Sequence, residues 1–238
     1  MSSLYLIRHG QAGPRARYDA LSDLGRRQAY LLGRYLAEQG VAFTACLAGC
    51  MNRQRQTAEE VWRAYRDCGV AAPDTISDAS WNEFDMAGVF SEFSGLIAAD
   101  DAAFRRDYEE LMRKLDDAGS PVHHAWTDCD TQVMRAWMEA RYQGCVESWE
   151  AFRRRVLAAR EALAAYRPGE TLAIFTSAMP IAIWVGAALG VADQKLMPLA
   201  GVMRNSAVTT MRLRGDELML HSFNGVPHLN AAELRTYR

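Results

Sequence analysis

The order of apolar and amphipathic stretches constrains this chain more than any other feature. Short apolar runs at Leu4–Ile7, Phe43–Gly49 and Leu172–Phe175 each lead towards a stretch with helical periodicity. Such alternation is typical of a mostly parallel sheet with helices on both faces. Two alternating stretches follow, Ala207–Leu213 and Glu217–Ser222, and predict a terminal hairpin with its turn at Arg214-Gly215-Asp216. We therefore expect an α/β fold, a three-layer sandwich around a mostly parallel central sheet.

The helices are predicted from caps and periodicity. A serine or aspartate at 22–23 can cap a helix that runs through Gln39. A second helix is expected from about Asn52 to Asp67, and a third over Ser148–Tyr166. Pro180 is expected to open an apolar helix after the strand that contains residues 172–175.

The stretch from about 90 to 145 differs from its surroundings. It contains two helical segments, near Asp101–Ala118 and Thr131–Tyr142, around a polar loop. We interpret it as a mainly helical insertion that covers one end of the sheet. The 238 residues, half of them hydrophobic, then form a single domain, 1–238, with this insertion.

Composition excludes several classes of protein. The formal net charge is −2, which argues against a nucleic-acid surface. No apolar run reaches about 18 residues, so we expect no membrane span. Five cysteines without a C-x-x-C pair, and no signal peptide, favour a reduced, cytoplasmic protein. A homodimer is possible on general grounds alone.

A histidine flanked by arginine and glycine follows the first strand. His9 can act as nucleophile, base or metal ligand, and Arg8 suits an anion with several oxygens, such as phosphate. An adjacent cation favours the neutral imidazole, which is the nucleophilic form. Gly10 is expected to let a ligand approach the backbone. The carboxyl end of a strand favours a site here, although an isolated triplet of this kind is more often structural.

Two more candidates follow the next extended stretches. Arg53 opens the second helix, so it is expected to point into the same crevice as His9. Glu83 lies between two aromatic residues, and an apolar environment raises the pKa of a carboxyl group, which suits a general acid. Asp85 is the alternative acid. Taken singly, each of these is more often a surface residue.

Four motifs together resemble the histidine phosphatase superfamily, in its phosphoglycerate-mutase-like branch. They are Leu4–Gln11 with R-H-G, Leu21–Ala29 (L-S-x-x-G-x-x-Q-A), Arg53–Ala58 (R-x-x-Q-T-A) and Trp81–Phe84 (W-N-E-F). The resemblance covers roughly residues 1–90 and 147–222 and leaves the insertion unexplained. Four ordered motifs at suitable strand ends are far more specific than any one of them.

The resemblance implies a phosphomonoesterase with a phosphohistidine intermediate. His9 would attack the phosphoryl group, and Arg8 and Arg53 would hold its oxygens. Glu83 would protonate the leaving alcohol and then help activate water. No metal and no other cofactor is implied, because arginines take the place of a cation. The ligand would be phosphate or a small phosphorylated metabolite or phosphoprotein, with a mutase less expected.

One part of the family pattern is missing. The family's second histidine, in S-H-G or T-H-G after the last parallel strand, corresponds here to Ser177. Ser177 can contact phosphate or cap the next helix, with the Met179 N–H as its partner. Loss of one charged transition-state contact costs roughly 2–4 kcal/mol, or about 10²–10³ in rate. Weak activity is expected, or a relative that binds a phosphorylated ligand or partner without turnover.

Other reactive side chains have weaker claims. His123, His124 and His228 are candidates to replace the missing imidazole, but each is more often a surface histidine. Cys129 and Arg135 have the C-x₅-R spacing of cysteine-based phosphatases. The aspartates beside Cys129 would raise the thiol pKa, and no glycine-bearing loop is present, so we expect this cysteine to be inert.

Overall fold

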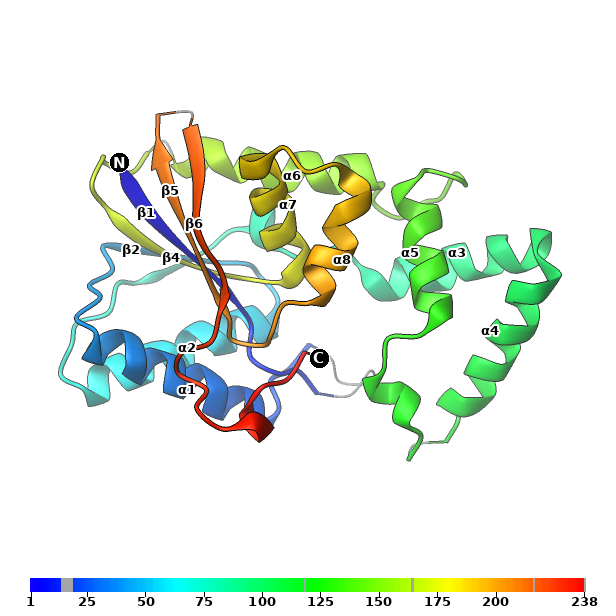
Figure 1. The fold of residues 1–238 in the computed structure, drawn as a ribbon, viewed down its shortest axis with the longest axis horizontal. Helices are drawn as coiled ribbons and strands as arrows, with labels where there is room; N and C mark the ends of the chain where they lie inside the picture. Colours follow the sequence, from blue (N-terminus) through cyan, green and yellow to red (C-terminus); the bar gives the residue numbers. More distant parts are fainter. Residues whose placement is uncertain (14–18, 118, 164, 216, 238) are drawn as a thin grey trace. The chain divides into compact units, whose positions relative to one another are not determined.

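Two compact units make up the chain (Figure 1). The computed structural model describes residues 1–13, 19–117, 119–163, 165–215 and 217–237. The first unit comprises Met1–Glu83 and Arg155–Arg238, and the second comprises Phe84–Arg154. This division does not test whether residues at about 90–145 are an insertion into a single domain, so that statement stays a prediction.

A single six-stranded sheet forms the centre of the first unit, in the order β3-β2-β4-β1-β5-β6. Its strands are β1 (Ser2–Arg8), β2 (Ala45–Ala48), β3 (Thr75–Ser77), β4 (Thr171–Thr176), β5 (Val208–Arg214) and β6 (Glu217–Gly225). Strands β1 to β4 run parallel, whereas β5 pairs antiparallel with both β1 and β6. The predicted α/β fold is confirmed, with a mixed sheet that is mostly parallel. The predicted turn residue Asp216 lies outside the described residues.

Helices lie on both faces of this sheet (Figure 1). In the first unit they are α1 (Asp23–Glu38), α2 (Asn52–Asp67), α7 (Ala178–Leu189), α8 (Leu196–Gly201) and the part of α6 (Trp149–Leu163) that begins at Arg155. Helices α1, α2 and α6 have nearly the predicted bounds. Helix α7 begins at Ala178, ahead of the predicted start at Pro180. A proline fits in the first turn, where its missing N–H has no intrahelical acceptor.

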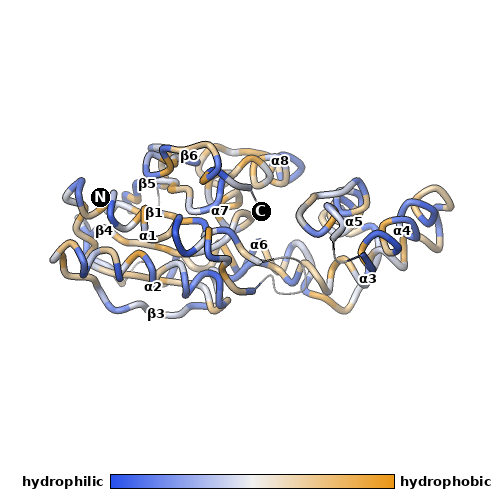
Figure 2. The backbone as a smooth tube through the Cα atoms, turned by 90° about the horizontal axis from the view of Figure 1, so that it is seen from below, coloured by the Kyte–Doolittle hydropathy of each residue, from blue (hydrophilic) through white to orange (hydrophobic). Residues whose placement is uncertain are grey.

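Alternate residues of the central strands pack on opposite faces, as the pleat requires. Ile7 of β1 and Phe175 of β4 belong to a core that includes buried residues of α1 and α2. Leu6 and Ile174, one position earlier in each strand, are fully buried on the other face. Figure 2 shows hydrophilic and hydrophobic residues alternating along α1 and α2, as expected for helices with one buried side. Because both faces of β1 and β4 are buried, the ends of these strands are held in place.

The second unit is helical, with α3 (Met86–Asp100), α4 (Ala102–Leu115), α5 (Asp128–Met138) and a short 3-10 turn at Pro121–His124. Helices α4 and α5 match the two predicted segments. Helix α3 was not predicted, because Gly88 and Gly95 lower its helix propensity. Its N-terminus is capped by Asp85, which accepts a hydrogen bond of 3.0 Å from the Gly88 N–H. Its apolar side is buried through Val89, Phe93 and Ile97.

Candidate active site

The ends of two parallel strands bring the first candidates together. Arg8 of β1 pairs in register with Thr176 of β4. The His9 N–H donates to the Thr176 carbonyl at 2.9 Å. The next residues, His9 and Ser177, therefore leave the sheet at the same edge, and both are buried. The structure thus places the R-H-G histidine beside the serine after β4.

The His9 ring has a defined proton position. Nδ1 lies 2.7 Å from the Gly10 carbonyl oxygen, which can only accept, so Nδ1 carries the proton. The pKa of His9 is lowered well below its ordinary value by burial first, and then by the charges of Arg53 and Arg8. The ring is therefore neutral near pH 7, with an unprotonated Nε2. That combination suits a nucleophile.

The glycine of the R-H-G motif serves packing rather than ligand approach. A Cβ on Gly10 would meet the backbone of Gly25, and a Cβ on Gly25 would meet the backbone of Gln11. The two glycines therefore allow the loop after β1 to lie against the start of α1. Our sequence interpretation of Gly10 as an opening for ligand is corrected accordingly, because the space at its α-carbon is filled by protein.

The polar residues of the second and third motifs brace this loop. The Gln11 N–H donates to Gln28 Oε1 at 2.8 Å, and the Gly10 N–H donates to Thr57 Oγ1 at 3.0 Å. The Thr57 hydroxyl in turn donates to the Arg53 carbonyl at 2.6 Å. Gln28 and Thr57 are fully buried, so these bonds are shielded from water. The motifs therefore hold the backbone that follows His9.

Both candidate arginines are buried and carry protein acceptors. The Arg8 guanidinium donates through Nη1 to the Met203 carbonyl, and through Nη2 to the Tyr237 carbonyl at 2.7 Å. Arg53 Nη1 lies 3.2 Å from Asp19 Oδ1, and the side chain of Asp19 is exposed. Sequence reasoning missed both Asp19 and the C-terminal segment, because no motif connects them with the site.

Ser177 does not cap α7 through its side chain. It occupies the N-cap position, but its hydroxyl makes no capping bond. Instead, Ser177 Oγ accepts a hydrogen bond of 2.9 Å from Gln54 Nε2. The Met179 N–H, the predicted partner of Ser177, donates to Glu83 Oε2 at 3.2 Å. The predicted Ser177–Met179 bond is therefore wrong, since the longer Glu83 side chain reaches that donor.

Glu83 thus lies at the N-terminus of α7. The short strand β3 precedes Glu83, as predicted, and the 3-10 turn η2 (Ala79–Trp81) lies between them. The neighbouring Trp81 is buried and stacks on Trp184 with ring centroids 5.1 Å apart. Asp85, the alternative acid, caps α3. Glu83 rather than Asp85 belongs to the group of residues around the ends of β1 and β4.

The other histidines have separate environments. His228 is buried, not on the surface as expected, and its Nε2 lies 2.8 Å from Ser206 Oγ. Burial lowers the pKa of His228 to about 3. His123 belongs to the second unit, where its Nε2 lies 2.9 Å from the Asp117 carbonyl oxygen. The side chain of His124 lies outside the described residues.

Cys129 has the properties expected of an inert cysteine. It is buried in the second unit. Burial, followed by the charges of Asp107, Asp130 and Asp128, raises its pKa to about 11. Almost no thiolate is present at neutral pH, which agrees with the sequence argument against a cysteine nucleophile.

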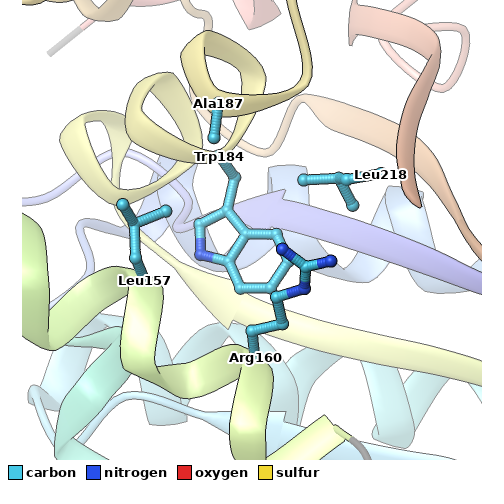
Figure 3. A pocket seen from close by; sticks show the side chains of 5 residues that line it. All are labelled: Leu157, Arg160, Trp184, Ala187 and Leu218. Atoms are coloured by element: carbon cyan, nitrogen blue, oxygen red, sulfur yellow. The ribbon is translucent and has the colours of Figure 1, made fainter. Parts of the chain in front are cut away.

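A cavity of about 220 Å³ lies in the first unit (Figure 3). It is lined by Leu157, Arg160, Trp184, Ala187 and Leu218. Leu218 pairs with Leu213, near the strand end opposite to the one that carries His9. Within the described part of the chain, no three His, Cys, Asp or Glu side chains come together as a metal site.

Comparisons with known proteins identify the family of this chain. A family profile of the histidine phosphatase superfamily (branch 1) matches residues 4–140 and 121–225. The serine/threonine-protein phosphatase Pgam5, mitochondrial, of Caenorhabditis briggsae is 41% identical over 158 residues. That match covers 62% of this chain and 53% of the relative, so the chain spans about half the length of that protein.

Solved structures share the fold at low sequence identity. Bacillus stearothermophilus YhfR superposes with a TM-score of 0.65 at 17% identity, covering 97% of this chain and 100% of that one. The phosphoglycerate mutase of Bacillus anthracis gives 0.61 at 17% identity, with 96% and 95% covered. No helix in the described residues has the length and apolar character of a membrane span. The family match extends over most of the chain, and the protein therefore belongs to the histidine phosphatase superfamily, branch 1.

Proposed function

We propose that the protein is a phosphomonoesterase that forms a phosphohistidine on His9. One observation carries the proposal: the buried, neutral His9 ring has its Nδ1 proton bonded to the Gly10 carbonyl, which puts the lone pair of the ring on Nε2, the nucleophilic nitrogen. Two guanidinium groups, of Arg8 and Arg53, act on the same ring. A neutral nucleophile beside fixed positive charge suits attack on a phosphate ester.

The proposed reaction has two steps. In the first, His9 Nε2 forms a bond to phosphorus while the bond from phosphorus to the ester oxygen breaks, and Glu83 gives a proton to the leaving alcohol. In the second, Glu83 takes a proton from water as the water oxygen attacks phosphorus. The P–N bond then breaks, and inorganic phosphate and neutral His9 are regenerated. No metal or organic cofactor takes part.

The arginines are proposed to bind the phosphoryl oxygens. At Arg8, phosphate would compete with neutral main-chain carbonyls, and a charged acceptor makes the stronger hydrogen bond. At Arg53, phosphate would compete with the Asp19 carboxylate. Asp19 is exposed, so its carboxylate can be rehydrated when phosphate binds. The negative charge of the transferred phosphoryl group would then be balanced by two guanidinium groups rather than by a metal ion.

Ser177 is proposed to stand in place of the family's second histidine. Its hydroxyl oxygen accepts from Gln54 Nε2, so its own proton is available to donate towards an oxygen anion near His9. A neutral hydroxyl stabilises such an anion less than an imidazolium does. Turnover is therefore expected to be slow relative to family members with two histidines.

The substrate is proposed to be a small phosphorylated metabolite or a phosphoprotein. The relative with 41% identity is named a serine/threonine-protein phosphatase, which supports testing phosphoserine and phosphothreonine peptides first. The helices of the second unit, Phe84–Arg154, lie outside the four family motifs. This unit is therefore a candidate for the part of the protein that selects the substrate.

A second candidate function is binding of a phosphorylated ligand or partner without turnover. The observation in its favour is that Ser177, which follows β4 beside His9, bonds Gln54 and has a neutral hydroxyl, so it brings no positive charge to the transition state. Such a protein would bind phosphate groups but release no phosphate from esters.

The test is phosphate release from a panel of phosphomonoesters and phosphopeptides, between pH 5 and 8, by the wild type and His9→Ala. The proposal predicts release that disappears in His9→Ala. Equal release by both proteins would overturn the mechanism. Binding of phosphopeptides by the wild type without any release would favour the second candidate function.

A further inference from the structure

The backbone beside His9 is held by a buried pair outside the four motifs. Ser206 donates its N–H to the His9 carbonyl at 3.1 Å, and Asn205 Nδ2 approaches the same oxygen at 3.4 Å. The next residue after Ser206 also contacts β1, because the Ala207 carbonyl accepts a hydrogen bond of 3.0 Å from the Arg8 N–H. Residues 205–207 therefore determine where the His9 main chain lies.

Ser206 adopts a conformation that is unusual for its type. Its φ is 56°, in the left-handed region, where residues other than glycine are uncommon. It is also fully buried. A strained backbone of this kind persists only when its surroundings hold it in place. The segment Asn205–Val208 contains no glycine or proline that would impose this conformation on Ser206.

His228 is the hydrogen-bond partner of the Ser206 side chain. Its Nε2 lies 2.8 Å from Ser206 Oγ, and its Nδ1 is buried with no hydrogen-bond partner in the structure. Burial keeps the ring neutral, so one nitrogen carries the single proton. Either Nε2–H donates to Ser206 Oγ or the Ser206 O–H donates to an unprotonated Nε2, and both arrangements join the two side chains by one hydrogen bond.

We propose that Ser206 and His228 are positioning residues for the nucleophile: their side-chain hydrogen bond holds the left-handed backbone at Ser206, whose N–H fixes the His9 main chain. Neither side chain needs to touch substrate. The inference rests on the proposed phosphohistidine mechanism for its effect on rate, but its geometric part concerns the backbone alone. A small displacement of a nucleophile lowers the rate of reaction more than the affinity for substrate.

The test compares Ser206→Ala with Ser206→Gly. Alanine removes the hydroxyl and keeps the strained backbone, whereas glycine removes the hydroxyl and adopts a positive φ without cost. We expect kcat to fall about tenfold in Ser206→Ala and about threefold or less in Ser206→Gly, with KM little changed in both. A role in stability alone would change the melting temperature without this difference in kcat.

Variants of His228 complete the set. His228→Leu is expected to match Ser206→Ala, and His228→Gln, whose amide can donate to or accept from the Ser206 hydroxyl, is expected to recover most of kcat. His221→Leu and Ser222→Ala are matched controls on β6, because both residues are exposed. Wild-type kcat in Ser206→Ala, or an equal loss in the alanine and glycine variants, would overturn the proposal. If His228→Leu does not fold, the two Ser206 variants decide.

A second readout separates this proposal from the proposed function. Hydrogen exchange of the Ser206 amide and of the His9 Nδ1 proton, followed by NMR, needs no turnover. Exchange is expected to be about tenfold faster in Ser206→Ala than in the wild type. If the wild type releases no phosphate, the proposed function fails, and unchanged exchange in Ser206→Ala would then overturn the positioning role as well.

Discussion

The ends of β1 and β4 differ in charge although the two strands are parallel neighbours. The β1 end carries Arg8 and His9, and Arg53 of α2 acts on the same imidazole. The β4 end carries Thr176 and Ser177, which have neutral side chains, and leads into the N-terminus of α7. The positive charge of the candidate site therefore comes from the β1 side.

The hydrogen bonds follow the same division. On the β1 side, backbone groups fix the nucleophile: the Gly10 carbonyl accepts from His9, and the Gly10 N–H is held by Thr57. On the β4 side, side chains fill the first turn of the helix, since Gln54 donates to Ser177 and Glu83 accepts from Met179. In the proposed mechanism, the β1 end provides the attacking group, and the β4 end provides the groups that act on the leaving alcohol and on water.

Glu83→Gln tests the chemical role assigned to the β4 side and has the largest expected effect. Glutamine keeps an oxygen that can accept from the Met179 N–H but cannot transfer the proton. Because Glu83 also acts in the second step, which is common to all substrates, the first step is followed through kcat/KM, which we expect to fall by about 10²–10⁴ for an alkyl phosphate. The fall should be much smaller for p-nitrophenyl phosphate, whose leaving group needs little protonation. Equal losses with both substrates would show that Glu83 is not the acid.

Arg53→Ala tests the charge on the β1 side. Removal of one guanidinium that stabilises the transferred phosphoryl group is expected to lower kcat/KM by about 10²–10³. The matched control is Arg55→Ala, because Arg55 lies on the same helix, is exposed and bonds Asn52. If the two variants have similar kcat/KM values, Arg53 is not part of the phosphate site.

Ser177→His would give the β4 end the imidazole that the family pattern has. A full charged contact is worth about 10²–10³ in rate, but the ring must replace a serine that is 1% exposed and bonded to Gln54. We therefore expect a net rise in kcat on the order of tenfold. Ser177→Asn, with a neutral side chain of similar length, is the control and should show no rise. A folded histidine variant with unchanged or lower kcat would mean that charge on this side does not limit turnover.

The titration of His9 has the smallest expected effect. Its pKa is lowered by burial and by both arginines, so its ring should stay almost entirely neutral between pH 7 and pH 6. A histidine with the ordinary pKa of about 6.5 would go from about three-quarters to about one-quarter neutral over that range. The ¹⁵N shifts of the ring measure this directly. A midpoint near pH 6.5 would contradict the structure, and Arg53→Ala should move the midpoint upwards.

Strands and amphipathic helices of the first unit were predictable because their residues alternate at the periods of buried strands and helices. The strand ends at His9 and Ser177 followed from the same pattern. Helix α3 was not predictable from periodicity, since its glycines weaken the signal and its apolar residues are spread around the helix axis. Tertiary packing outweighs propensity there.

The contacts of the candidate site were harder to predict than its members. The sequence predicts that Met179 offers an N–H, but not that Glu83 reaches it before Ser177. Likewise, the bond between Arg8 and the Tyr237 carbonyl joins residues 229 positions apart, and no local pattern indicates it. The burial of His228 also depends on the whole fold, because a lone histidine after a strand has no periodic signal. Such long-range pairings are set by the packing of complete elements.

The most direct test of the central claim is to trap the phosphorylated enzyme. The protein would be mixed with a ³²P-labelled phosphomonoester that it turns over, and quenched within one turnover. We predict a label on protein that is stable in base and lost in acid, as a phosphohistidine is, and that is absent from His9→Ala. Phosphate release by the wild type with no such label, or an equal label on His9→Ala, would contradict attack by His9.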